Sequence, residues 1–132
     1  MIFLKTEDEI ELLRQSNLLV GKTLAEVAKL VKPGVTTREL DKVAEEFIRD
    51  NGAIPTFKGF PNQYGDPFPG SLCTSVNEQV VHGIPGDIVL KEGDIILMHD
   101  IFETSVQAAF QIIDTLEKEN YEFVTVDELL WE

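Results

Sequence analysis

The residues that could do chemistry are concentrated in one stretch of the chain, from Ser71 to Asp100. This stretch holds the chain's single cysteine, Cys73, and both of its histidines, His82 and His99. A histidine suits general acid and base catalysis or metal binding, and the carboxylate of Asp100 is a second type of metal ligand. Because Asp100 directly follows His99, the two side chains would point to opposite faces of a strand. The pair is therefore a candidate only for weak, adventitious binding of a divalent metal, and packing at a sheet edge is the alternative for His99.

The sequence around these side chains predicts short strands. Apolar and β-branched runs over 71–76 and 79–82 flank the turn pair Asn77-Glu78, which is the pattern of a hairpin. The run from Ile95 to Met98 is apolar throughout, as is typical of a strand buried on both faces. A further strand is expected over 53–60, placed at a sheet edge by its proline. A sheet is therefore expected to position the chemical residues.

Three stretches have the spacing of amphipathic helices, and each opens with a capping box. They run from Thr6 to about Val31, from Thr36 to Asn51, and from Thr104 to about Glu119, and a last strand is expected over 121–126. The apolar stripe of the first helix consists of Ile10, Leu13, Val20, Leu24, Val27 and Val31, with Asn17 as its polar member. The expected fold class is α+β, with three amphipathic helices packed on one mixed, mainly antiparallel sheet, in a single domain over residues 1–132.

Composition narrows the classes of partner. With 24 acidic and 11 basic residues the formal net charge is −13, which disfavours nucleic acid and anionic membranes as partners. A lone cysteine excludes an internal disulfide framework. The opening MIFLKTEDEIELL has neither a basic region nor a long apolar run, so no targeting signal or membrane span is expected. We expect a cytoplasmic protein.

The segments KTEDEIELLRQSN, VKPGVTTRELD, CTSVNEQVVHGIPGD and LKEGDII carry a resemblance. Through them, residues 1 to about 96 resemble the N-terminal half of type I methionine aminopeptidase. The resemblance implies a dinuclear metal hydrolase in which the histidine matching His82 contacts the substrate or stabilises the transition state. It also implies that the residue matching Cys73 lines the pocket for the methionine side chain. Neither is a metal ligand in that family.

A second resemblance begins at about Gly93. The segment from there onward resembles the C-terminal strand, helix and strand of a polysaccharide deacetylase, and it reads GDIILMHDIFETSVQAAFQIIDTLEKENYEFVTVDELL. In that family the histidine matching His99 acts as a general acid. We therefore interpret the chain as a laboratory-made or recombined chimera, with a deacetylase-like segment over 93–132 and a junction within Gly93–Ile96.

Neither segment supplies a complete active site, because a two-metal centre needs several carboxylates around both ions. The sequence thus predicts a folded product of fragment fusion that is not an enzyme and has no cofactor. His82 and His99 are vestigial catalytic candidates, Cys73 and His82 a vestigial substrate pocket, and Cys73 is expected to be a small buried side chain. Two alternatives remain open, a residual metal-dependent methionine aminopeptidase and a peptide-binding fragment without chemistry. Strand edges left by the missing parts predict a homodimer, formed in one version by swapping the C-terminal unit.

Overall fold

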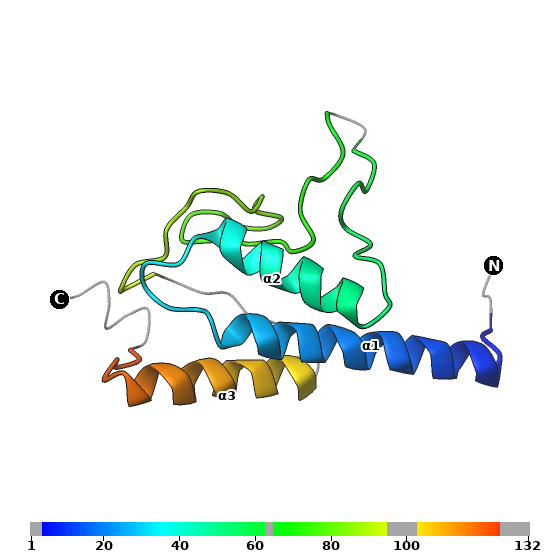
Figure 1. Cartoon of the computed structure of the whole chain (residues 1–132), viewed down its shortest axis with the longest axis horizontal. Coiled ribbons are helices and arrows are strands. Elements are labelled where there is room, and N and C mark those ends of the chain that lie inside the picture. The colour runs from blue at the N-terminus through cyan, green and yellow to red at the C-terminus, as the bar shows by residue number, and fades with distance from the viewer. Residues whose placement is uncertain (1–3, 63–64, 95–102, 125–132) are drawn as a thin grey trace.

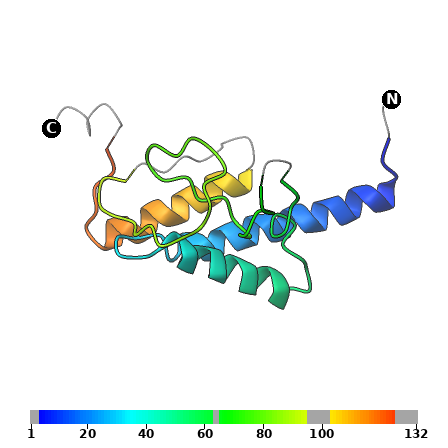
Figure 2. The same ribbon diagram turned by 90° about the horizontal axis from the view of Figure 1, so that it is seen from above.

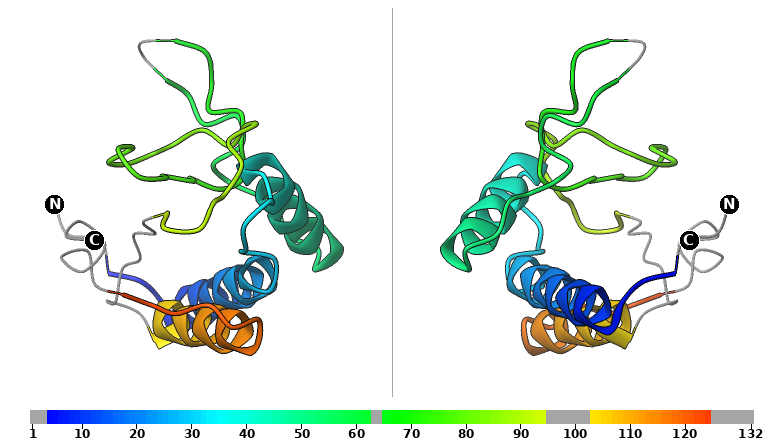
Figure 3. Two further views of the ribbon diagram at one scale, coloured as in Figure 1. Left: turned by 90° about the vertical axis from the view of Figure 1, so that its left-hand side faces the viewer. Right: turned by 90° about the vertical axis from the view of Figure 1, so that its right-hand side faces the viewer.

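The fold is a set of three helices joined by a long irregular connection. The computed structural model describes residues 4–62, 65–94 and 103–124, with helices α1 (Glu7–Ala28), α2 (Thr37–Asp50) and α3 (Glu103–Lys118). α1 contacts both other helices and runs between them, with α2 on one side and α3 on the other (Figure 1). Seen along α1, the described residues that follow α2, 51–62 and 65–94, lie mostly on the side of the molecule away from α3 (Figure 3).

Two helices begin where the capping boxes predict. Thr6 accepts a hydrogen bond from the Glu9 amide at 3.3 Å, and the Glu9 carboxylate accepts one from the Thr6 amide at 2.8 Å. Thr36 and Glu39 make the same reciprocal pair at 3.2 and 2.7 Å. Each box satisfies two backbone donors that the first turn leaves without an intrahelical partner. The starts of α1 and α2 are therefore fixed by local sequence, and that part of the prediction is confirmed.

The main core lies where α1 crosses α2. Val27, Leu40, Ala44 and Leu90 are buried there against one another, and we call these four residues the helix junction. A second cluster joins Ala28 of α1 to α3 through Ile112 and Leu116. Both clusters lie toward the C-terminal end of α1, and Figure 2 shows α2 and α3 alongside that end while the N-terminal end projects beyond them.

The predicted sheet is wrong for the described part of the chain. Across residues 4–62, 65–94 and 103–124 β-pairing is limited to isolated bridges such as the antiparallel one between Thr36 and Val89, and the α+β class is therefore not observed. The physical reason lies in where the backbone hydrogen bonds of 70–90 go. Several of them pair with the Asp41 carboxylate and with the first backbone amides of α2, and the others are single contacts such as Thr74 N to Gly83 O, so no ladder forms. The expected strands over 53–60 and 121–124 are likewise turns or irregular chain.

The helix ends also differ from the expected ones. α1 ends at Ala28, about one turn before Val31, and its C-cap Lys29 donates its amide to Val27 O. α3 begins at Glu103, so Thr104 lies inside its first turn and is not the residue that precedes it. The strand expected over 95–98, and with it His99 and Asp100, lies outside the described residues, as do residues 125–126.

The apolar stripe of α1 is buried only in part. Val27 is 8% exposed, whereas Leu13 is 49% and Val20 is 55% exposed. Periodicity marks the face of a helix that will be covered, but it does not say what covers it. In this structure the N-terminal half of the stripe is open to solvent.

Candidate substrate-binding site

Asp41 of α2 holds the segment that leads to Cys73. Its Oδ1 atom accepts hydrogen bonds from the backbone amides of Ser71 and Leu72, both at 2.7 Å. A carboxylate shared by two amides is a charge-assisted contact and is stronger than a neutral pair. Gly70 fits tightly beside it, because a Cβ there would lie 2.8 Å from the ring of Pro85. The backbone before Cys73 is therefore fixed against α2.

A backbone contact joins the two segments that carry the predicted pocket residues. The amide of Thr74, next to Cys73, donates to the carbonyl of Gly83, next to His82, at 2.9 Å. The Gly83 amide in turn donates to the Ser75 hydroxyl at 3.3 Å. A Cβ at position 83 would lie 2.2 Å from Thr74 O, so only glycine permits this approach. The structure thus brings the Cys73 and His82 segments together, as a pocket formed by both residues requires.

His82 has an unusual backbone conformation. Its φ of 55° lies in the left-handed region, which β-carbon-bearing residues seldom adopt. Such conformations cost about 1–3 kcal/mol and persist where surrounding contacts fix them. Here the neighbouring Gly83 supplies those contacts, and the His82 side chain is exposed.

Cys73 is exposed, so the prediction of a small buried side chain is wrong. Partial desolvation of the sulfur raises the pKa of the Cys73 thiol, and the negative charge of Asp41 adds to that effect. The thiol therefore remains protonated at neutral pH, and a protonated thiol is a poor nucleophile and a poor metal ligand. This chemistry fits a pocket wall better than it fits a nucleophile.

Two buried hydroxyls lie on either side of Cys73. Ser71 Oγ and Thr74 Oγ1 are shielded from solvent, and neither has a hydrogen-bond partner within the described part of the chain. Ser71 as a residue is 5% exposed. Buried hydroxyls are nearly always paired in folded proteins, because leaving one unpaired costs about 1–3 kcal/mol. Each is therefore an unmet hydrogen-bonding group within the segment that carries Cys73.

The N-terminus of α2 makes a second anchor, which the sequence analysis missed. The free amides of Thr37 and Arg38 donate to the carbonyls of Ile88 and Gly86 at 3.0 and 2.9 Å. The Thr37 hydroxyl also contacts the Gly86 backbone, and Arg38 Nε donates to Asp87 Oδ1 at 2.9 Å. The available signal was the cap at Thr36, since the first amides of every helix need partners from outside it.

A metal centre does not form from the described residues. Among residues 4–62, 65–94 and 103–124, no three histidine, cysteine, aspartate or glutamate side chains come close enough to hold an ion. The donor set here therefore does not fit a two-metal site, which needs several carboxylates. The weak metal candidates His99 and Asp100 lie outside the described residues.

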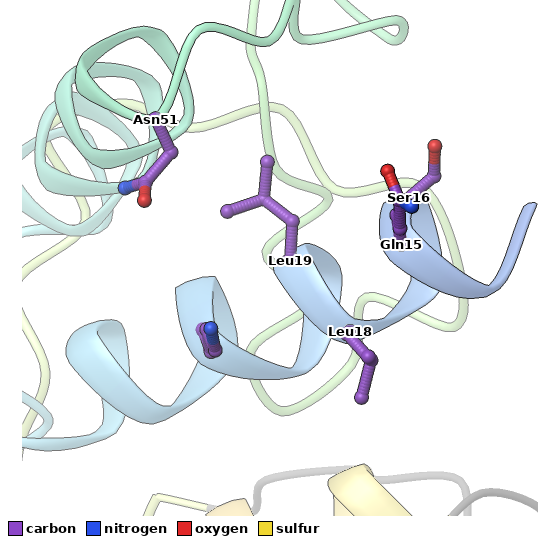
Figure 4. Close-up of a pocket in the computed structure, with 6 residues that line it drawn as sticks. Gln15, Ser16, Leu18, Leu19 and Asn51 are labelled. Atoms are coloured by element: carbon purple, nitrogen blue, oxygen red, sulfur yellow. The ribbon is translucent and has the colours of Figure 1, made fainter. Parts of the chain in front are cut away.

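A separate open pocket of about 350 Å³ lies between α1 and the C-terminal end of α2 (Figure 4). It is lined by Gln15, Ser16, Leu18, Leu19, Lys22 and Asn51. In Figure 4 the Leu19 side chain extends toward Asn51, whereas Leu18 extends away from it. Asn51 follows α2, whereas Asp41 and its contacts lie near the start of that helix. The pocket therefore has no part in the Cys73 and His82 site.

Comparison with known proteins shows the protein family to which this chain belongs. A model of metallopeptidase family M24 matches residues 11–104, and the chain belongs to this family. The methionine aminopeptidase of Clostridium perfringens is 54% identical over 96 residues, which cover 73% of this chain and 36% of the relative. Methionine aminopeptidase 1 of Bacillus subtilis is 51% identical over 96 residues, covering 73% of this chain and 37% of the relative. The crystal structure of methionine aminopeptidase from Rickettsia prowazekii matches with a TM-score of 0.63 and 41% identity, over 71% of this chain and 36% of that one.

These findings correct the interpretation as a chimera. The family match extends to residue 104, beyond the junction expected within Gly93–Ile96, and none of the comparisons supports a deacetylase-like segment. The prediction of an artificial, non-enzymatic protein is also wrong, because the relatives are aminopeptidases. The resemblance of the N-terminal segment to methionine aminopeptidase is confirmed. The chain spans about 36% of the length of the relatives it matches.

Proposed function

We propose that this chain acts in the removal of N-terminal methionine, as the part of a methionine aminopeptidase that holds the substrate. The observation that carries the proposal is the Thr74 to Gly83 hydrogen bond, which fixes the segments of Cys73 and His82 beside each other. In the proposed site Cys73 forms a wall for the methionine side chain and His82 contacts the substrate peptide. The relatives at 54% and 51% identity, both methionine aminopeptidases, support this assignment.

The physical properties of the site suit this role. The protonated Cys73 thiol is small and weakly polar, which favours contact with a thioether side chain. The exposed imidazole of His82 can reach a ligand from solvent without rearrangement of the core. Hydrolysis itself belongs to a metal centre that the described residues do not form, so the chain's own contribution is binding and orientation.

Peptide binding tests the proposal directly. Titration of a Met-Ala-Ser peptide into the full chain, followed by calorimetry, should give saturable binding that weakens at least tenfold in His82→Ala. Glu78→Ala removes an exposed side chain from the same loop and should leave binding unchanged. An Ala-Ala-Ser peptide should bind more weakly, because it leaves the Cys73 wall without its side-chain contact. Equal binding of both peptides, or unchanged binding in His82→Ala, contradicts the proposal.

Turnover is a second readout once the metal-binding portion of a methionine aminopeptidase is supplied, because the described residues form no metal centre. Release of methionine from the same peptide by that mixture, with manganese or cobalt present, should disappear when a chelator is added and fall in His82→Ala. A cytoplasmic location is part of the same proposal, supported by a lone cysteine in a chain without a disulfide framework, and cell fractionation tests it. The expected absence of a cofactor stays a prediction.

A further inference from the structure

The segments that carry Cys73 and His82 are each bound to the same helix, α2. We call them the Cys73 arm, residues 70–76, and the His82 arm, residues 82–88. The carboxylate of Asp41 accepts two amides of the Cys73 arm, and the hydroxyl of Thr37 bonds the backbone of the His82 arm. Because Thr37 and Asp41 are four residues apart in α2, they lie on the same side of the helix, one turn from each other. One face of α2 therefore carries one anchor for each arm.

The Thr37 anchor is buried and uses its hydroxyl both as donor and as acceptor. Its Oγ1 atom accepts a hydrogen bond from the Gly86 amide at 2.9 Å and donates one to the Gly86 carbonyl at 3.1 Å. Thr37 is 1% exposed. Because a buried backbone group that loses its partner is costly, these two bonds hold Gly86 against the first turn of α2.

The Asp41 anchor lies where the two arms touch. A Cβ added to Gly70 of the Cys73 arm would lie 3.2 Å from Asp41 Oδ1 and 2.8 Å from the ring of Pro85 in the His82 arm. The arms are joined again farther along the chain by the hydrogen bond from the Thr74 amide to the Gly83 carbonyl. With contacts at two places, a displacement of one arm is transmitted to the other.

We propose that Thr37 and Asp41 are positioning residues that together set the spacing between the Cys73 and His82 arms, and through it the preference for a methionine side chain. The inference rests on the proposed function for the identity of the ligand. It goes further by assigning the geometry of the site to two residues that do not touch the ligand. Each acts through the backbone of its arm, and the contacts between the arms make the two anchors interdependent.

Conservative substitutions separate the anchoring bonds from the bulk of the side chain. Thr37→Val keeps the shape and removes both hydroxyl contacts, whereas Thr37→Ser keeps the hydroxyl. Asp41→Ala removes the acceptor of the two amides, whereas Asp41→Asn keeps an acceptor oxygen without the charge. Two matched controls lie on the same helix. Arg38→Gln removes an exposed ion pair to Asp87, and Asp50→Asn makes the Asp41 change at an exposed position at the other end of α2.

Selectivity in peptide binding is the first readout. Met-Ala-Ser and Ala-Ala-Ser are titrated into the full chain, and the ratio of their affinities is measured by calorimetry. Thr37→Val and Asp41→Ala should each lower the preference for Met-Ala-Ser about tenfold, since a methionine side chain that loses its wall loses much of its burial energy. Thr37→Ser, Arg38→Gln and Asp50→Asn should keep the parent ratio. A parent-like ratio in Thr37→Val and in Asp41→Ala would overturn the proposal.

Amide hydrogen exchange, followed by NMR, is the second readout and needs no ligand. Thr37→Val should speed exchange of the Leu72 amide, although Leu72 belongs to the other arm, and Asp41→Ala should speed exchange of the Gly86 amide. The buried Ala28 of α1 reports global unfolding, so the effect is the increase in rate beyond that of the Ala28 amide. If each substitution changes exchange only in the arm that it contacts, the anchors are independent and the proposal is wrong.

The two readouts separate a failure of the anchors from a failure of the proposed function. A parent chain that binds neither peptide contradicts the proposed function, and the exchange between arms then decides the role of the anchors. Selective binding by the parent without effects between arms overturns the anchors and leaves the proposed function standing. Circular dichroism checks that each variant folds. Should Asp41→Ala not fold, Asp41→Asn replaces it, with a smaller increase expected at Gly86 because a neutral acceptor holds the amides more weakly.

Discussion

The two halves of α1 share one apolar period but have different environments. At the C-terminal end, Val27 and Ala28 are buried by α2 and α3, while earlier along the helix Leu13 and Val20 face solvent. Figures 1 and 2 show the reason, since both neighbouring helices lie alongside only the later turns. Helical periodicity therefore indicates which side of a helix will be covered. The neighbouring elements decide which turns of that side are buried and contribute to stability.

The largest expected difference in stability is between alanine variants of two leucines, one buried and one exposed. Leu40→Ala removes a side chain that is 5% exposed in the helix junction, and it should lower the free energy of unfolding by about 3 kcal/mol. Leu13→Ala removes the same atoms from the exposed half of α1 and should change it by less than about 0.5 kcal/mol. Urea unfolding of both variants measures the difference. Equal losses would show that Leu13 of α1 is as well covered in solution as Leu40 of α2.

A smaller loss of stability is expected from a change at the Thr74 to Gly83 contact in the loop. Gly83→Ala places a Cβ 2.2 Å from Thr74 O, so the loop must move and the Thr74 to Gly83 bond must lengthen. We expect a loss of about 2 kcal/mol in unfolding free energy and loss of peptide binding. Gly86→Ala is the control, because its Cβ would find Ile84 O at 3.9 Å. Wild-type binding in Gly83→Ala would refute this geometry.

The capping boxes of α1 and α2 are expected to contribute unequally to global stability. Thr36→Ala removes the cap of a packed helix, and it should cost about 1 kcal/mol of global stability. Thr6→Ala removes an equivalent cap from the projecting end of α1, where fraying is local. Hydrogen exchange should show faster exchange of first-turn amides in Thr6→Ala with the melting temperature unchanged. A lower melting temperature in Thr6→Ala would mean that the projecting end supports the whole fold.

The smallest expected effect is on the decline of the melting temperature at acid pH. Hydrogen bonds from Lys58 and then Arg49 lower the pKa of Glu45 from its usual 4.5. Because the folded pKa is the lower one, this stabilisation is present above about pH 4.5 and is lost as the pH falls through the folded pKa. Glu45→Gln should therefore flatten the decline of the melting temperature between pH 5 and pH 3. Glu46→Gln, which removes the next carboxylate along α2, should leave that decline as steep as in the parent.

Local sequence was sufficient for the helices and for two of their caps. A threonine followed three residues later by a glutamate satisfies backbone amides within one turn, so Thr6 and Thr36 act without help from distant residues. The motif around Cys73 and His82 was likewise sufficient to indicate the family. Strands could not be predicted in the same way, because a strand needs a partner, and the partner expected over 95–98 lies outside the described residues.

The sequence by itself therefore determined the helical segments and the acidic composition, and the family resemblance of its motifs marked Cys73 and His82 as candidate pocket residues. Only the tertiary structure decided that Asp41 and Thr37 would bind the backbone of 70–88, and that half of the α1 stripe would remain exposed. The physical reason is the separation along the chain of the groups that interact. Caps and periodicity act over three or four residues, whereas the Asp41 and Thr37 contacts join groups 30 to 49 residues apart and exist only once α2 and the loop have met.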